Sequence, residues 1–158
     1  MVRKFEKISL EQFIKDTNLS EKEYNSYSLP KRGTKYSAGY DFELLSNLVL
    51  EPGEKKKIPL GIKAQMNIDE VLLIIIRSSL GTKFNLRMCN QVGVIDADYY
   101  NNEDNEGHIM ITIQNESENT KELKKGEKIC QGIFIKYYTV ENEEKVKKTR
   151  TGGFGSTN

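Results

Sequence analysis

The feature of the sequence that most constrains the fold is a series of short apolar runs separated by turn residues. Residues 47–50 form one run, which ends at the turn sequence Glu-Pro-Gly-Glu, and residues 57–65 form a second run that Pro59 and Gly61 interrupt. Many short strands with turn residues between them are typical of a sandwich, a barrel or a jelly roll. We therefore predict an all-β fold.

Two further runs indicate how strands would lie in the core. Residues 71–76 are all Val, Leu or Ile, which suits a strand that is buried on both faces. Residues 108–114 instead alternate between two kinds of side chain, as in a strand with one buried face. That buried face would carry Ile109, Ile111 and Ile113.

The last apolar segment, residues 128–140, also alternates. Strand periodicity predicts two faces, one with Ile129, Ile133 and Ile135 and the other with Cys130 and Phe134. Gln131 is the one polar residue on the inward side of this strand. A tolerated glutamine in a hairpin would explain it without any function.

The beginning of the chain has a helical pattern. Ser9 and Gln12 have the spacing of a capping box, and apolar residues then recur at three- and four-residue intervals. We predict a helix near residues 9–17, a second helical turn after Ser20, and an extended arm or loop over residues 24–37.

The chain therefore divides into an N-terminal extension with a short helix (1–28), a β core (29–140) and a flexible C-terminal segment (141–158). The last segment contains three glycines around Phe154, and such a tail cannot hold itself in place. It is either disordered or folded over something. The polar run at residues 101–107 is expected to be a solvent-exposed loop.

The charge balance limits the kinds of partner. Lys and Arg number 24 against 23 Asp and Glu, so the basic surplus typical of proteins that bind DNA or anionic membranes is missing. The longest apolar run is too short to span a membrane, and the first residues contain no apolar signal-peptide core. Cys89 and Cys130 are expected to be reduced. We predict a cytoplasmic protein without a nucleic-acid or membrane partner.

The residue types also exclude several catalytic chemistries. His108 is the only histidine, so one chain can form neither a two-histidine metal site nor a Ser-His-Asp triad. Glycine-rich nucleotide loops and the zinc-deaminase signature are absent. Catalysis would have to use carboxylates, Arg, Lys, hydroxyls and backbone groups. That set favours Mg²⁺-assisted chemistry on phosphates.

Two segments carry side chains suited to phosphate chemistry. Arg77, Ser78 and Ser79 offer a bidentate cation and two hydroxyls at the end of a strand, although a surface turn with an ion-paired Arg is the commoner interpretation. Asp96 and Asp98 are two residues apart, so on an extended strand they would lie on the same side. One of them could hold a water as general base.

Five short segments follow one another in a distinctive order. They are Ala-Gly-Tyr-Asp at 38–41, Arg-Ser-Ser-Leu-Gly at 77–81, Gly-Val-Ile-Asp-Ala-Asp-Tyr at 93–99, Gly-Glu-Lys-Ile-Cys-Gln at 126–131 and Gly-Gly-Phe-Gly-Ser-Thr at 152–157. The series resembles the five motifs of the trimeric dUTP diphosphatases, over about residues 29–158. The resemblance implies a distorted antiparallel jelly roll, a homotrimer with active sites at subunit interfaces, and Mg²⁺-dependent hydrolysis of dUTP to dUMP and pyrophosphate. That reaction keeps uracil out of DNA and supplies dUMP for thymidylate synthesis.

The resemblance also implies roles for individual residues. Asp96 would activate the water that attacks the α-phosphorus, and Tyr99 would pack against the deoxyribose and exclude a 2′-hydroxyl. Uracil would be recognised by backbone groups of a hairpin between the third motif and the next strand, and Phe154 would stack on the base. The other residues expected at the uracil are Asn90, Gly93, Ile95 and Met110.

The phosphates would be held by a separate set of residues. The set comprises Arg77, Ser78, Ser79 and Gln131 of the core, with Arg150, Ser156 and Thr157 of a tail that closes over the site as a lid. Mg²⁺ would sit mainly on the phosphates and waters, with Asp41 contacting it through water. Whether Arg150 or Lys148 meets the γ-phosphate stays open, because Arg150 is one residue closer to the glycine pair than in many members of the family.

Three departures from the family pattern leave alternatives open. Ser79 replaces a usual Gly and fits the Arg-Ser-Ser segment of the related dCTP deaminases, but those enzymes need a glutamate in the strand after the third motif, which residues 108–113 lack. Residues 101–106 look like an insertion, and the N-terminal helix has no counterpart in compact family members. Either could serve a protein partner, which would make the chain an interaction protein as well.

Overall fold

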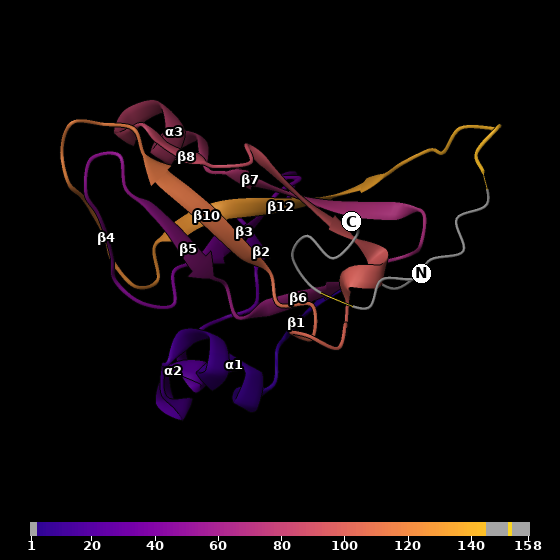
Figure 1. Ribbon diagram of the computed structural model, residues 1–158, viewed down its shortest axis with the longest axis horizontal. Coiled ribbons are helices and arrows are strands. Elements are labelled where there is room, and N and C mark those ends of the chain that lie inside the picture. Colours follow the sequence, from indigo (N-terminus) through magenta and orange to yellow (C-terminus); the bar gives the residue numbers. More distant parts are fainter. Residues whose placement is uncertain (1–2, 145–151, 153–158) are drawn as a thin grey trace.

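A five-stranded antiparallel sheet forms one side of the molecule. The computed structural model of the chain describes residues 3–144 and residue 152 (Figure 1). In spatial order the sheet consists of β2 (Lys31–Arg32), β3 (Tyr40–Glu43), β12 (Lys128–Lys136), β7 (Glu70–Ile76) and β9 (Val92–Asp96). Its long central strands β7 and β12 pair over seven residue positions, from Cys130 with Ile76 to Lys136 with Glu70.

Smaller sheets and four short helical elements make up the rest of the described chain. The three-stranded sheet has the order β5 (Lys55–Pro59), β10 (Met110–Asn115) and β8 (Leu86–Met88), and the two strand pairs are β4 (Leu48–Leu50) with β11 (Lys121–Leu123) and β1 (Lys4–Lys7) with β6 (Ile62–Gln65). The helical elements are α1 (Leu10–Thr17), α2 (Glu21–Ser26), α3 (Ser78–Phe84) and the 3₁₀ turn η1 (Ala97–Tyr99). The prediction of an all-β class with a short helical segment is confirmed.

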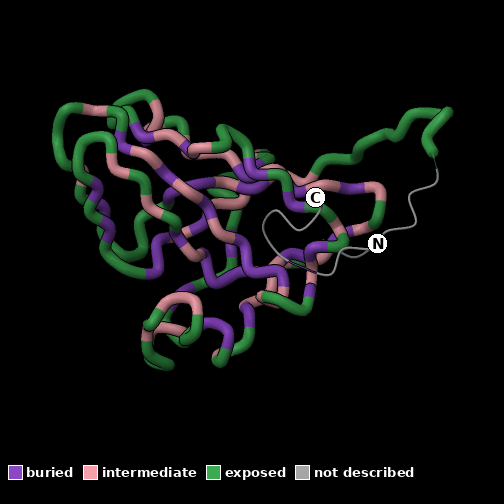
Figure 2. The backbone as a smooth tube through the Cα atoms, in the orientation of Figure 1, coloured by how far each residue is buried: buried purple, intermediate pink, exposed green. Residues whose placement is uncertain are grey.

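The core lies between the sheets, where buried stretches of the strands cross in the middle of Figure 2. Ile109, Ile111 and Ile113 are each at most 3% exposed, as their alternation predicted. Strand β7 differs from its prediction. Leu72 and Ile74 are fully buried, whereas the side chains that alternate with them are only half-buried, so one face of β7 is incompletely covered in the single chain.

A β-bulge changes the predicted faces of β12. Lys128 pairs with Glu43 and Cys130 with Phe42, so Ile129 is an extra residue in the ladder. Ile129 and Cys130 are therefore both fully buried. The prediction that Ile129 shares a face with Ile133 and Ile135 is wrong, because alternation restarts after the bulge.

Strand β12 also ends earlier than its sequence pattern suggested. The partner strand β7 begins at Glu70, which pairs with Lys136, and beyond this pair the Tyr137 N–H donates to the Asp69 carbonyl at 3.1 Å. Residues 137–144 are exposed and project away from the body of the molecule (Figures 1 and 2). Tyr138 and Val140 are 89% and 67% exposed, which is unusual for apolar side chains.

The N-terminal residues are joined to the β core. Helix α1 begins after Ser9, whose side chain accepts a hydrogen bond from the Gln12 backbone N–H as predicted, and α2 has a capping box at Ser20. Strand β1 was not predicted. It pairs with β6 and places Phe5 against the rings of Tyr40, Phe42 and Phe134.

Candidate active site

Three of the five sequence motifs meet at one end of the five-stranded sheet. Asp41 lies on β3, Gln131 lies opposite it on β12, and Arg77 follows the last residue of β7. The Arg77 Nε lies 3.3 Å from Asp41 Oδ1, and the Lys128 Nζ lies 3.0 Å from Asp41 Oδ2. Since two cations surround one carboxylate that is 11% exposed, this cluster carries a local positive surplus suited to a phosphate ligand.

The glycine of the first motif fits against the glutamine of the fourth. A Cβ atom at Gly39 would lie 2.2 Å from Gln131 Oε1 and 3.1 Å from Gln131 Cβ. Only glycine therefore allows the Gln131 side chain to stay beside β3. Because alternation restarts after the bulge, Gln131 lies on the face opposite Cys130, and the prediction that it points inward is wrong.

The second motif forms a helix that the sequence did not reveal. Arg77 is the residue preceding α3, and its backbone N–H donates to the carbonyl of Ile129 at 3.2 Å. Ser78 is exposed and Ser79 is half-buried in the first turn of that helix. Leu80 fixes α3 to the core with 5% exposure, which holds both hydroxyls next to Arg77.

Asp96 ends strand β9 and is exposed. The chain turns immediately after it into η1, which carries Asp98 and Tyr99. The prediction that Asp96 and Asp98 share one side of an extended strand is wrong, because Asp98 lies in a 3₁₀ turn. Of the two carboxylates, only Asp96 is presented by the sheet.

The strand register separates Asp96 from the cluster around Arg77. Asp96 aligns with Val71 on β7, whereas Gln131 aligns with Ile75 and Arg77 lies two residues further on. At about 3.3 Å per residue, those offsets amount to about 13 Å and about 20 Å along the strand. A general base must lie within about 3 Å of the water it activates. Within one chain, Asp96 is therefore not brought next to the cluster around Arg77.

The residues expected at uracil are divided between two strands and a turn. Gly93 and Ile95 are buried residues of β9, where they pair with Ile74 and Leu72 of β7, and Asn90 is exposed in the turn before β9. Met110 begins β10, where it pairs with Pro59. The predicted hairpin between the third motif and the next strand is wrong, because β9 pairs with β7 while β10 pairs with β5 and β8.

Tyr99 is 5% exposed, and its hydroxyl donates to the carbonyl of His108 at 2.9 Å.

Burial raises the pKa of the Cys130 thiol far above its ordinary value, which leaves it protonated. Cys130 is therefore not a nucleophile of this site.

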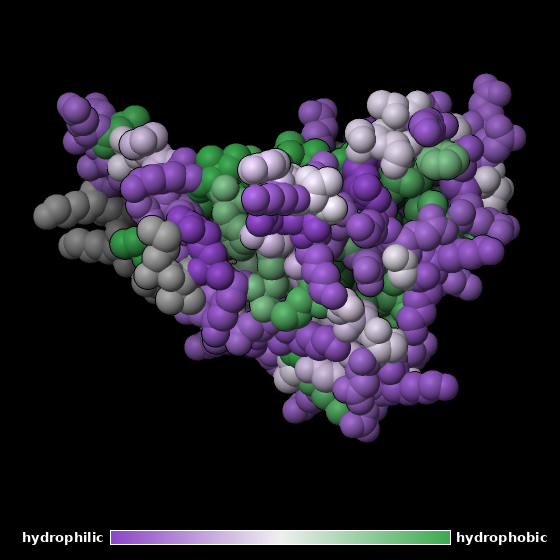
Figure 3. All heavy atoms as spheres, turned by 180° about the vertical axis from the view of Figure 1, so that it is seen from behind, coloured by the Kyte–Doolittle hydropathy of each residue, from purple (hydrophilic) through white to green (hydrophobic). Residues whose placement is uncertain are grey.

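The outer face of the five-stranded sheet, on the side away from the core, connects the two regions. Between Asp96 and Gln131 it carries the apolar side chains of Val92, Val94, Leu73, Ile75, Ile133 and Ile135. Val94 and Ile135 are 59% and 42% exposed. In Figure 3, the view from behind, apolar side chains gather across the middle of the surface between hydrophilic margins. Exposed apolar faces of this kind are typical of surfaces that a protein or another ligand covers.

Sequence reasoning missed Lys128 as a member of the cluster. Its position within the fourth motif was a signal, but only the pairing of β12 with β3 brings its ammonium group to Asp41. The predicted site residues Arg150, Phe154, Ser156 and Thr157 lie outside the described residues, as does Lys148. Within residues 3–144, no three His, Cys, Asp or Glu side chains are grouped so that they could hold a metal ion.

Comparison with known proteins identifies the family. The dUTPase family model matches residues 25–158. A deoxyuridine 5′-triphosphate nucleotidohydrolase of Lactococcus lactis subsp. lactis is 47% identical over 131 residues, which cover 82% of this chain and 87% of the relative. The chain belongs to the dUTPase family.

Solved dUTPases share the fold. The crystal structure of the Streptococcus mutans dUTPase superposes with a TM-score of 0.72 at 37% identity, covering 87% of this chain and 98% of that one. A Staphylococcus bacteriophage 80alpha dUTPase mutant with dUpNHpp superposes with a TM-score of 0.68 over 99% of this chain and 95% of its own, but at 21% identity it shows the fold alone. The predicted jelly roll is confirmed.

The sequence of β10 also fits the dUTPase assignment. Strand β10 has the sequence Met-Ile-Thr-Ile-Gln-Asn and contains no glutamate, so the site lacks the carboxylate expected of a dCTP deaminase. No helix among the described residues is long and apolar enough to cross a membrane. The dUTPase family model begins at residue 25, so β1 and α1 lie outside it.

Proposed function

We propose that this chain hydrolyses dUTP to dUMP and pyrophosphate at active sites built jointly by neighbouring copies of the chain. The activity follows from membership of the dUTPase family. The single observation that carries the shared site is the separation of Asp96 from the Arg77 cluster along β7. A neighbouring copy is needed to bring a base to the phosphates.

The cluster around Arg77 is the phosphate half of the site. Arg77 is half-exposed, so its guanidinium can exchange part of its interaction with Asp41 for a bidentate contact to phosphate. Lys128 adds a second cation, and Gln131 offers an amide donor. The hydroxyls of Ser78 and Ser79 would contact phosphate oxygens at the start of α3.

Asp96 supplies the base in the other half. Its carboxylate orients a water and accepts its proton as the water oxygen attacks the α-phosphorus. The bond from that phosphorus to the bridging oxygen breaks, and pyrophosphate leaves. An exposed carboxylate at the rim of a sheet can do this only when a substrate and a neighbouring surface exclude bulk water.

Uracil and deoxyribose would bind beside Asp96. We assign the backbone of Gly93 and Ile95 to the uracil, with Asn90 from the preceding turn and Met110 from β10 at its edge. Tyr99 would limit the space at the sugar and thereby exclude a 2′-hydroxyl. Support comes from their placement: three of these residues follow one another along β9 and η1.

The residues present fit a magnesium ion that is carried mainly by the substrate. No closed carboxylate cage exists among the described residues, and both oxygens of Asp41 are already near cations. Asp41 therefore suits a contact through water rather than direct ligation. When bound, the ion neutralises phosphate charge and makes the α-phosphorus easier to attack.

A homotrimer would cover the outer face of the sheet and complete each site. The exposed apolar side chains of this face lie between the two half-sites. Packing a neighbour on the face therefore brings Asp96 of one copy toward Arg77 of another. Residues 137–144 project from the body in a direction that could reach a neighbour. We assign Phe154 to uracil stacking and Arg150, Ser156 and Thr157 to the γ-phosphate as parts of a lid, on the sequence pattern alone. The reaction on a free nucleotide fits the predicted cytoplasmic location.

A mixing experiment tests the shared site. Asp96→Asn and Arg77→Met chains should each be almost inactive alone, but coexpressed chains should recover about a quarter of the wild-type activity. Each site of a cyclic trimer takes Asp96 from one copy and Arg77 from its neighbour, so random assembly leaves about one site in four intact. Pyrophosphate release from dUTP with Mg²⁺ is the measurement.

Two different tags on the variants provide the control, because tandem purification proves that mixed assemblies formed. If doubly tagged assemblies show no more activity than the separate variants, each site lies within one chain and the proposal is rejected. A wild-type chain that leaves dUTP unchanged under the same conditions would reject the activity itself.

A further inference from the structure

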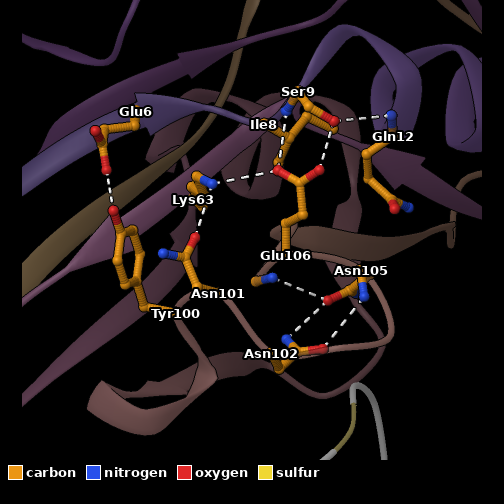
Figure 4. Close-up of polar contacts among 12 residues, drawn as sticks. Glu6, Ile8, Ser9, Gln12, Lys63, Tyr100, Asn101, Asn102, Asn105 and Glu106 are labelled. Atoms are coloured by element: carbon orange, nitrogen blue, oxygen red, sulfur yellow. Dashed lines mark hydrogen bonds and ion pairs between the residues drawn. The ribbon is translucent and has the colours of Figure 1, made fainter.

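The segment after the third motif is a closed and internally bonded loop. The Asn101 N–H donates to the Glu106 carbonyl and the Glu106 N–H donates to the Asn102 carbonyl, both at 3.0 Å. Asn102 is 7% exposed, so the prediction of a fully solvent-exposed loop is wrong at this residue. Its side-chain oxygen accepts hydrogen bonds from the backbone N–H groups of Asp104 and Asn105. The loop therefore has one defined shape (Figure 4).

Two asparagines of this loop hold Tyr99 at both ends. The Asn102 side-chain amide donates to the Tyr99 carbonyl at 2.8 Å, and the Asn105 side-chain amide donates to the Tyr99 hydroxyl at 2.9 Å. Gly107 then passes so closely that a Cβ atom there would lie 2.6 Å from the Tyr99 carbonyl oxygen. The position of Tyr99 thus depends on the shape of the loop.

Glu106 connects this loop to the N-terminal segment. Its carboxylate accepts hydrogen bonds from the backbone N–H of Ser9, at 3.0 Å, and from the Ser9 hydroxyl. It also lies 3.2 Å from the Lys63 Nζ, which donates to the Asn101 side-chain oxygen at 2.7 Å. Figure 4 shows Glu106 directed from the loop toward Ser9 and Lys63, with Tyr100 meeting Glu6 nearby.

The N-terminal segment is a firm anchor for these contacts. Strand β1 pairs with β6 over four positions, and Ile8 and Phe13 are fully buried. The Asp16 carboxylate of α1 accepts from His108 Nδ1 at 2.6 Å, at the far end of the same loop. This anchor lies almost wholly before residue 25, where the dUTPase family model begins.

The charge state of Glu106 suits this connection. Partial burial tends to raise its pKa, but the hydrogen bonds from Ser9 and the ammonium of Lys63 outweigh burial, so the pKa is lowered. The carboxylate is therefore ionised at neutral pH, when its hydrogen bonds are strongest.

We propose that Glu106 is a positioning residue for substrate selection: it ties the N-terminal segment to the loop that carries Tyr99 and so fixes the sugar-facing wall of the active site. This inference rests on the proposed role of Tyr99 at the deoxyribose. Glu106 acts only through the loop, and it touches neither substrate nor the reacting atoms. The insertion then serves discrimination between deoxyribose and ribose, rather than a protein partner.

The test compares dUTP with UTP as substrates of the full-length chain. Glu106→Ala should lower the ratio of kcat/KM for dUTP to kcat/KM for UTP by about tenfold, because losing hydrogen bonds to a charged group releases the loop. For dUTP, we expect most of the change to appear in KM. The kcat for dUTP should stay within about twofold of the wild-type value. Glu106→Gln, which keeps the length and the acceptor oxygen, should restore much of the ratio.

Glu103→Ala is the matched control, since Glu103 is an exposed glutamate of the same loop. It should leave the ratio unchanged. If Glu106→Ala folds and keeps the wild-type ratio, the proposal is wrong. If it does not fold, Lys63→Met decides, because it removes the ion pair with Glu106 and the hydrogen bond to Asn101 but leaves the contacts of Glu106 with Ser9. It should lower the ratio about threefold, and an unchanged ratio overturns the proposal. Failure of the wild-type chain to hydrolyse dUTP would instead reject the proposed function.

Discussion

The two halves of the proposed active site are built in different ways. The phosphate half brings together Asp41, Arg77 and Gln131 through the pairing of β3, β12 and β7, so strand register fixes its geometry. The half around Asp96 and Tyr99 lies at the end of one strand, and a loop and the N-terminal segment hold it in place. Strand pairing makes the phosphate half a rigid cluster. The half around Asp96 and Tyr99 depends on a loop, whose shape can change without disturbing the sheet.

The two halves also differ in how far the dUTPase family model covers their contacts. The motifs of the phosphate half lie within residues 25–158, which the dUTPase family model matches. The other half adds contacts from Ser9 and Asp16, which lie before residue 25. Substitutions in the first half should therefore impair phosphate binding, and substitutions around the second should alter selectivity.

The largest effect should come from removing the base. Asp96→Asn keeps the size of the side chain but cannot accept a proton, so we expect kcat to fall by about 10²- to 10⁴-fold. The phosphate half is untouched, and dUTP should still bind. Single-turnover pyrophosphate release and calorimetric titration with dUTP measure the two properties. A variant that retains most of its kcat would show that Asp96 is not the base.

A smaller effect should come from disturbing the phosphate half alone. Gly39→Ala introduces a methyl group 2.2 Å from the present position of Gln131 Oε1, so the amide must rotate away. Losing one hydrogen bond to phosphate should raise the KM for dUTP by about tenfold and leave the dUTP to UTP ratio unchanged.

Gly33→Ala provides the control for that experiment. A Cβ at Gly33 meets Asp41 Oδ2 at 3.8 Å, an ordinary contact in the same cluster. It should change KM little. Equal effects of the two substitutions would mean that Gln131 has no special part in binding.

The smallest effect concerns how the free energy of unfolding depends on pH through His108, which follows the loop after Tyr99. His108 accepts a hydrogen bond from the Gly61 N–H at Nε2 and contacts Asp16 through Nδ1. Burial lowers the pKa of His108, although Asp16 opposes this. The unfolded chain, with a histidine pKa of about 6.5, then binds more protons. The free energy of unfolding should therefore fall as the pH drops below about 6.5, by at most about 1.4 kcal/mol per pH unit.

Urea denaturation between pH 5 and pH 8 measures this dependence. The carboxylates contribute their own decrease mainly at lower pH, because Glu6, Glu70 and Glu106 have lowered pKa values. His108→Asn should flatten the curve just below about pH 6.5. A slope that persists in this variant would assign the effect to another group.

Much of the fold could be predicted from the sequence because most strands carry their own pattern. Alternation located β10 and the beginning of β12, and capping residues located α1 and α2. Helix α3 was missed because Gly81 and Thr82 are poor helix formers, and burial of Leu80 outweighs that propensity. Strand β1 was missed because its partner β6 is more than fifty residues away.

The site could be predicted only as a set of residues. Motif order identified Arg77, Asp96 and Gln131 without showing that the first and last meet while Asp96 lies elsewhere. That arrangement depends on the register between β7 and its neighbours, which no local pattern encodes. The contacts of Glu106 and His108 were equally hidden, because their partners Ser9 and Asp16 are more than ninety residues away.

Ile129, the extra residue of the β-bulge, interrupts the side-chain alternation of β12. If Ile129 instead took an ordinary paired position in the ladder, every later side chain of that strand would change sides: Gln131 would enter the core and Cys130 would lie on the outer face. Deleting this one buried isoleucine should make the ladder regular and leave Gln131 on its present face, because Lys128 and Cys130 already pair with the adjacent residues Glu43 and Phe42. The bulge thus lets the strand accommodate one more residue while the glutamine of the phosphate half keeps its side of the sheet.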